Sequence, residues 1–87
     1  DPIATDDSTT VVLRNKITEL AHCIDPALSI HDFRMVPGPT HTNLIFDVVT
    51  PFGFRLEDAE VARQLRALIR TFDSHYVPVI QVEHSYI

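Results

Sequence analysis

The sequence predicts an α+β fold, an open-faced sandwich in which two helices cover one face of a three-stranded sheet. Two stretches, from about residue 9 to 24 and from about 56 to 71, repeat apolar residues every three or four positions, as amphipathic helices do. Three other stretches alternate in the manner of half-buried strands. Turns that contain proline separate these segments and give the order α-β-β-α-β.

The first predicted helix runs from about Thr9 to Ile24. Residues 6–8 carry short side chains with oxygen atoms, which accept hydrogen bonds from the free N–H groups of a helix start. Asp25-Pro26 ends the helix, because proline pushes the residue before it out of the α region. The apolar stripe of this helix consists of Leu13, Ile17, Leu20 and Ile24.

A β-hairpin is predicted next, and it is the part of the chain with the most polar residues capable of chemistry. Its first strand, Ser29 to Val36, alternates; we expect one face to carry His31, Phe33 and Met35 and the other Ile30, Asp32 and Arg34. Pro37-Gly38-Pro39-Thr40 breaks the strand, since the prolines remove donors and the glycine permits a positive φ. The second strand, Asn43 to Val49, presents Leu44, Phe46 and Val48 on one side.

The second half of the chain predicts a helix and a strand. The helix, from about Leu56 to Thr71, has acidic residues in its first turns and arginines later, as the helix dipole favours. The strand, Tyr76 to Tyr86, carries Pro78 near its start, which indicates either an edge position or a strand that begins later than Tyr76. Its two faces are predicted to hold Ile80, Val82 and His84 on one side and Val79, Gln81 and Glu83 on the other.

The second face of such a sheet has no helix to cover it. Ile45 and Val49 fall on that face, opposite the residues that point toward the helices. Exposed apolar sheet surface of this kind predicts a partner, and self-association is the simplest one.

Composition narrows the classes of function. The chain has 87 residues and a formal net charge of −5, which argues against nucleic acid as a partner. The single cysteine, Cys23, excludes an internal disulfide and a Cys-x-x-Cys metal site. No apolar run approaches the roughly 18 residues that cross a bilayer. No glycine-rich phosphate loop or nucleophile motif is present, so we expect no enzymatic activity.

Several motifs, in this order and spacing, resemble one known family. They are HDFR at His31 to Arg34 followed by PGPT, LIFDV at Leu44 to Val48, and the closing VIQVEHSY. Together with the α-β-β-α-β order, they resemble the C-terminal cytoplasmic domain of cation diffusion facilitator transporters over roughly Ser8 to Tyr86. The resemblance implies a ferredoxin-like, metallochaperone-like fold. It also implies that residues 1–7 are a linker from a transmembrane domain of the same chain and that residues 8–87 are the cytoplasmic domain.

The same resemblance implies a homodimer that binds divalent cations, mostly zinc, near its interface. His31 matches a ligand at the start of the first strand, Asp47 lies one residue from the ligand position in the second strand, and His84 falls where some members carry a carboxylate. Imidazole and carboxylate groups are zinc ligands, so these three residues are the predicted metal site. The chain departs from the pattern at Val82 and about Glu60, where some members carry histidines, and Phe46 stands at the ligand position of the second strand.

The resulting hypothesis is a regulatory and dimerisation domain of a cation-efflux transporter, on the cytoplasmic side of the cell membrane. One alternative is a free-standing ferredoxin-like module that binds a metal or a small molecule. A metallochaperone should carry a Cys-x-x-Cys loop, which this chain lacks. The other alternative is a pure dimerisation domain without metal.

Overall fold

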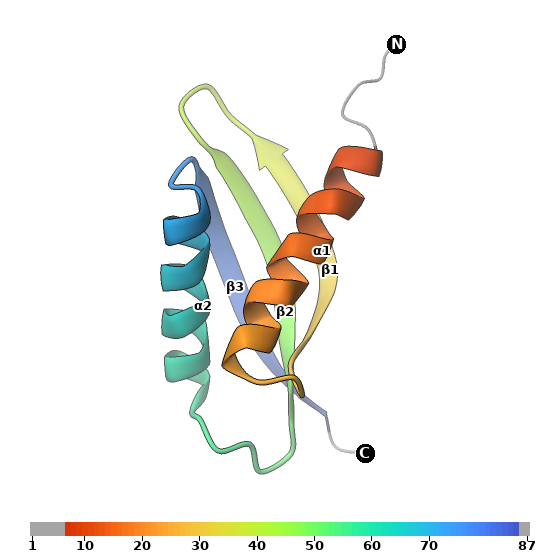
Figure 1. Cartoon of the computed structure of the whole chain (residues 1–87), viewed down its shortest axis with the longest axis vertical. Coiled ribbons are helices and arrows are strands. Elements are labelled where there is room, and N and C mark those ends of the chain that lie inside the picture. Colours follow the sequence, from red (N-terminus) through yellow and green to blue (C-terminus); the bar gives the residue numbers. More distant parts are fainter. Residues whose placement is uncertain (1–6, 86–87) are drawn as a thin grey trace.

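A computed structural model describes residues 7–85 and confirms the predicted order of elements (Figure 1). The linker predicted at residues 1–7 lies outside the described residues except for Asp7, which is the first residue of a helix. Tyr86, the predicted end of the last strand, also lies outside them. Within the described part of the chain, no helix is long and apolar enough to cross a membrane. The elements are α1 (Asp7–Ile24), β1 (Ser29–Pro37), β2 (Thr42–Pro51), α2 (Asp58–Phe72) and β3 (Tyr76–Ser85).

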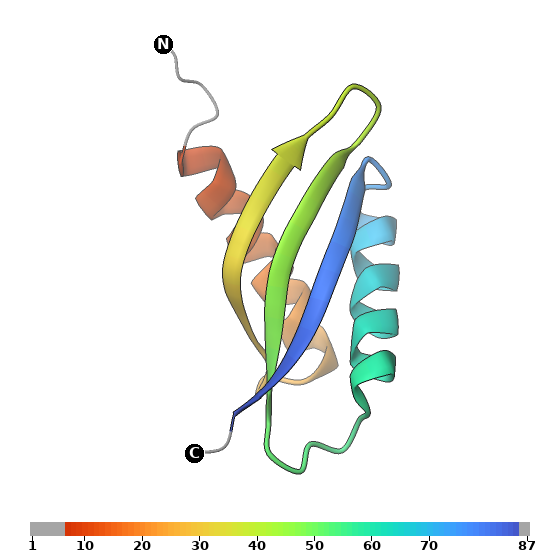
Figure 2. The same ribbon diagram turned by 180° about the vertical axis from the view of Figure 1, so that it is seen from behind.

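The sheet has the order β1-β2-β3, with β1 antiparallel to β2 and β3 parallel to β2. The parallel pair is possible because α2 returns the chain across the sheet between β2 and β3. Both helices lie on the same face of the sheet, and the opposite face is uncovered (Figures 1 and 2). β3 is an edge strand, which confirms the expectation from Pro78.

The core lies between the helices and the central strand β2. Leu44, Phe46 and Val48 alternate along β2 and are each no more than 1% exposed. The two helices cover them with apolar side chains, while the ring of Phe33 stacks on Phe46 with centroids 5.8 Å apart. The buried apolar side chains that the helices contribute are Leu13, Ile17, Ala21, Val61, Leu65 and Ile69.

The first strand differs from the predicted alternation because it contains a β-bulge. The register with β2 shifts between His31 and Arg34, and Asp32 has a φ of +55°. Aspartate tolerates this left-handed conformation better than most residues, and one extra residue reverses the faces of the strand from that point. His31 therefore does not share a face with Phe33 and Met35, as the alternation predicted.

The hairpin turn differs in one detail from the sequence-based expectation. Gly38 does not need a positive φ; instead, a β-carbon there would lie 3.0 Å from the carbonyl oxygen of His41. The backbone N–H of Gly38 donates to that same oxygen at 2.9 Å. Close approach of two backbone segments is therefore the reason for glycine at this turn.

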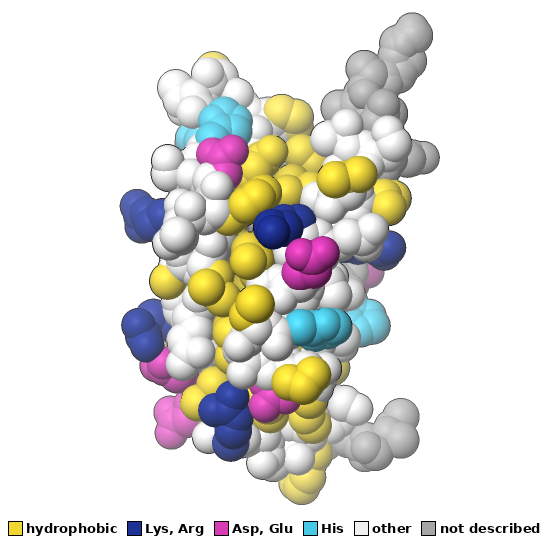
Figure 3. Space-filling view, in the orientation of Figure 1, with side chains coloured by type: hydrophobic (Ala, Val, Ile, Leu, Met, Phe, Trp, Pro, Cys, Tyr) yellow, Lys and Arg dark blue, Asp and Glu magenta, His cyan; other side chains and the backbone are white. Residues whose placement is uncertain are grey.

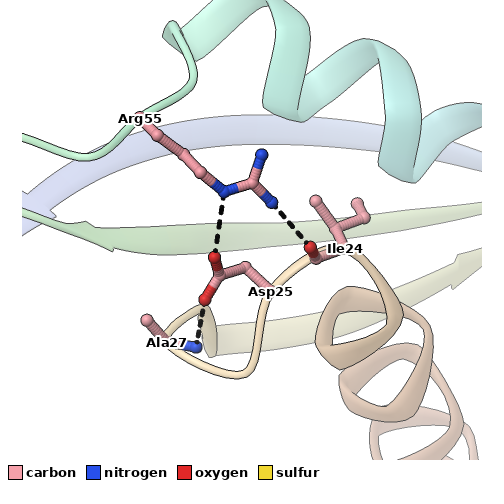
Figure 4. A network of polar contacts seen from close by, with 4 residues as sticks. All are labelled: Ile24, Asp25, Ala27 and Arg55. Atoms are coloured by element: carbon pink, nitrogen blue, oxygen red, sulfur yellow. Dashed lines mark hydrogen bonds and ion pairs between the residues drawn. The ribbon is translucent and has the colours of Figure 1, made fainter.

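A polar network ties the end of α1 to the loop that enters α2 (Figure 4). Arg55 donates through Nε to a carboxylate oxygen of Asp25 at 3.2 Å and through a terminal nitrogen to the carbonyl of Ile24 at 2.9 Å. The N–H of Ala27 donates to the other carboxylate oxygen of Asp25 at 2.9 Å. The bond from Ala27, followed by the hydrogen bond and the charge of Arg55, holds the pKa of Asp25 below its usual value.

We expect Phe46→Ala to lower the free energy of unfolding by about 3–5 kcal/mol, because it opens a cavity in the centre of the core. Phe52→Ala is the matched control; Phe52 is 75% exposed, and its replacement should change stability by about 0.5 kcal/mol or less. Urea unfolding followed by circular dichroism measures both. Equal effects of the two substitutions would contradict this description of the core.

We expect Arg55→Gln to raise the pKa of Asp25 toward, but not fully to, its usual value, because the bond from Ala27 remains. A lowered pKa in the folded state stabilises the fold above the usual pKa of aspartate, and this contribution is lost as the pH falls through the lowered value. A carboxyl NMR titration measures the change. Arg63→Gln is the control; it should leave Asp25 unaffected and raise the pKa of Glu60, which the Arg63 guanidinium lowers to about 2.

Candidate functional site

The bulge places two of the three predicted ligands side by side on the uncovered face of the sheet. His31 in β1 and Asp47 in β2 are directly opposed partners in the antiparallel ladder. Such partners have β-carbons about 4.5–5.5 Å apart on the same face. Nε2 of His31 is hydrogen-bonded to the hydroxyl of Ser29 at 3.2 Å, and the imidazole is exposed. An exposed imidazole and a half-buried carboxylate are thus adjacent.

His84, the third predicted ligand, lies on the other face of the sheet. Its partner in β2 is Thr50, which is buried beneath the helices and whose hydroxyl is 3.3 Å from Nδ1 of His84. Nε2 of His84 lies 3.0 Å from the carboxylate of Asp58, the first residue of α2. His84 therefore links the end of β3 to the start of α2.

The three predicted ligands consequently do not converge within one chain. Across residues 7–85, no group of three or more histidine, cysteine, aspartate or glutamate side chains is arranged to hold a metal ion. Zinc sites in proteins use about four ligands. The pair of His31 and Asp47 equals half of such a set in number, so the described residues of one protomer do not form a complete zinc site.

The remaining histidines and the cysteine contribute nothing further to a metal site. His41 is hydrogen-bonded to the hydroxyl of Thr40 in the hairpin turn, and His75 to that of Thr42. His22 is hydrogen-bonded to the carbonyl of Leu28. Cys23 is exposed on α1.

The uncovered face around His31 and Asp47 divides into two halves. Near the hairpin turn, most side chains on this face are apolar. Near the opposite end of the strands, most of them are polar. The apolar half contains Val36, Ile45, Val77 and Val79, of which the three valines are 40–49% exposed, and Arg34 and Asn43 lie among them. The polar half contains Ser29, His31, Asp47, Gln81 and Glu83 together with Val49.

Sequence reasoning missed two features of this region. It assigned Asp58 to the helix start without pairing it with His84, which is 26 residues away along the chain. It also missed the bulge at Asp32. A signal for the bulge was present, since the residues that face the helices are Ile30, Phe33 and Met35, a spacing of three and then two.

Comparison with known proteins supports the fold. No protein-family model matches the chain, and no curated protein sequence matches it. Among solved structures, the chain is similar to the metal-bound C-terminal domain of the CzcD transporter from Thermotoga maritima, with a TM-score of 0.66 and 17% sequence identity. The match covers 86% of this chain and 91% of that domain.

This likeness confirms the predicted fold class, and it confirms at the level of the fold the resemblance drawn from HDFR, PGPT and the closing strand. The matched protein is a domain of a transporter. At 17% identity, the match shows that the two domains share the same arrangement of helices and strands.

Proposed function

We propose that this chain is the cytoplasmic dimerisation and regulatory domain of a divalent-cation efflux transporter of the cation diffusion facilitator family. The observation that carries the proposal is the fold shared with the C-terminal domain of a transporter over 86% of the chain. The motifs around His31 and in β3 resemble the same family. In this proposal the domain does no catalysis, and its partners are a second copy and the membrane domain of its own chain.

The uncovered sheet face supports a symmetric dimer. In a two-fold arrangement with the axis along the strands, the apolar half of one face meets the apolar half of the other. β1 of each copy then lies over β3 of its counterpart, which brings the edge with Arg34 and His31 toward the edge with Glu83. An axis across the strands would instead place the apolar half against the polar half. The pattern of the face therefore favours the first arrangement.

The same arrangement provides a role for a cation. Asp47 lies on the central strand, so the two copies of this carboxylate face each other near the axis, where like charges repel. A divalent cation between them relieves the repulsion, and one His31 from each copy completes four donors. Imidazole and carboxylate donors suit zinc. In this proposal a single protomer holds half of the site, in agreement with the pair seen on its surface.

Metal-dependent closure follows from this arrangement. A cation that binds the closed dimer more tightly than the separated faces shifts the population toward closure. The difference in affinity between the two states is then the coupling free energy available to the membrane domain. His84, which lies on the other face with Asp58, has no part in this closure.

We expect the chain to be a homodimer in solution, and we expect Val79→Glu to weaken the dimer by burying a charge in the apolar half of the face. Phe52→Glu is the matched control; Phe52 is exposed in the turn after β2 and should not affect association. Sedimentation velocity over a concentration series measures both. A wild-type protein that stays monomeric throughout would contradict the proposal.

We expect zinc to bind through His31 and Asp47 and to strengthen the dimer. His31→Ala should lose zinc binding, whereas His84→Ala should retain it. Asp47→Asn should associate more tightly than the wild type without metal and should no longer respond to zinc, because the facing charges are gone. Since protons compete with zinc for its ligands, zinc affinity should fall as the pH is lowered.

Isothermal titration calorimetry and sedimentation with and without zinc test this. Unchanged zinc binding in His31→Ala and Asp47→Asn would refute the proposed site on the uncovered face of the sheet. Loss of binding in His84→Ala alone would assign the metal to the face beneath the helices. A dimer that binds no divalent cation at neutral pH would leave the pure dimerisation domain as the function.

A further inference from the structure

The side chains of two arginines on α2 engage no other residue of the described chain, as is also the case for Arg14 and Arg34. Arg63 is held by Glu60, and Arg55 by Asp25. Arg66 and Arg70, one helical turn apart, form no ion pair or hydrogen bond with any residue of the described range. Both guanidinium-bearing side chains are exposed.

The two arginines line one small pocket at the junction of α2 and β3. Its volume is about 110 Å³, which is three to four times the roughly 30 Å³ that a water molecule occupies in the liquid. That volume is adequate for a phosphate group. The pocket is lined by Arg66, Arg70, Ser74, Tyr76, Val77 and Pro78.

No acidic side chain is among these lining residues. The nearest carboxylate along the chain, that of Asp73, accepts a hydrogen bond from the backbone N–H of His75 at 2.9 Å. Ser74, in the turn between α2 and β3, adds a hydroxyl donor to the two guanidinium groups. The charged side chains that line the pocket are thus both positive, beside the apolar Val77 and Pro78, in a chain whose formal net charge is −5.

The two positive charges repel each other weakly, and an anion between them removes this repulsion. Like charges four residues apart on a helix repel each other, by a few tenths of a kcal/mol. The helix dipole favours cations in the last turn and accounts for Arg70, but its effect does not extend to Arg66. A guanidinium group forms paired hydrogen bonds with phosphate oxygens, so one phosphate group satisfies both side chains.

The position of the pocket in the molecule favours a lipid as the source of phosphate. The end of α2 and the start of β3 lie at the same end of the domain as the start of α1 (Figure 1). Val11, Val12 and Phe72 are exposed near this end, and the apolar groove between the helices runs toward it (Figure 3). Exposed apolar residues next to basic ones are typical of surfaces that touch anionic bilayers.

We propose that Arg66, Arg70 and Ser74 form a binding pocket for a phosphate group, carried either by an anionic phospholipid or by a soluble phosphate. The pocket is separate from the His31–Asp47 pair, which lies on the uncovered face of the sheet. Its occupancy does not depend on zinc or on the transporter assignment.

The test compares three forms of the whole chain. They are the wild type, a pocket variant that combines Arg66→Gln and Arg70→Gln, and a matched control that combines Arg14→Gln and Arg63→Gln. The control removes the same charge outside the pocket. Inorganic phosphate, followed by the amide NMR signals of Ser74 and Val77, probes the soluble source. Co-sedimentation with phosphatidylcholine vesicles, with and without phosphatidylglycerol, probes the lipid source. Thermal unfolding verifies that each variant is folded.

We expect the pocket variant to lose at least about tenfold in affinity for the phosphate source, because two charge-assisted contacts disappear, while the control stays near wild type. Binding to phosphatidylglycerol vesicles without a response to inorganic phosphate assigns a lipid headgroup; saturable shifts with inorganic phosphate assign a soluble ligand. The proposal is overturned if the wild type binds neither probe, or if the control loses as much affinity as the pocket variant.

Discussion

The fold depends on the burial of one strand. Leu44, Phe46 and Val48 of β2 point toward the helices and are almost completely excluded from water, and both helices and both neighbouring strands pack around them. β2 is the only strand of the described sheet with a neighbour on each side. In a chain of 87 residues, where only about 60–65% of the unfolded surface can be buried, a single apolar row has to serve the whole domain.

The burial of this row determines what its alternate residues can do. Side chains on a strand alternate between faces, so the residues between the buried ones must point to the uncovered face. Ile45, Asp47 and Val49 occupy those positions and are half-buried rather than buried. The central strand thus supplies both the core and the middle of the face that we propose for dimerisation, and a shift of one residue in its register would exchange the two.

The bulge at Asp32 extends this arrangement to β1. It allows Ile30, Phe33 and Met35 to face the core while His31 remains beside Asp47. The reversal requires a left-handed φ at Asp32, which is locally unfavourable for a residue other than glycine. Bulges of this kind often redirect a side chain at a functional site. The contrast with His84 is informative, since β3 has an unbroken register with β2 and its histidine therefore stays on the helix side with Thr50.

The sequence by itself determined the fold class, the order of elements, the end of α1 at Asp25-Pro26 and the residues of β2 that form the core. These features follow from local periodicity and from proline, whose effects act within a few residues. The sequence also identified His31 and Asp47 as candidates, but it assigned His31 to the wrong face relative to Phe33 because strict alternation contains no bulge.

Only the tertiary structure decided which candidates meet. Partners such as His31 with Asp47, and His84 with Asp58, are separated by many residues along the chain, and their proximity depends on strand register and on where α2 begins. The pocket at Arg66 and Arg70 likewise requires the turn that brings Ser74 and β3 against the helix. Periodicity assigns a residue to a face, whereas long-range pairing assigns it a neighbour, and the chemistry of a site depends on the neighbour.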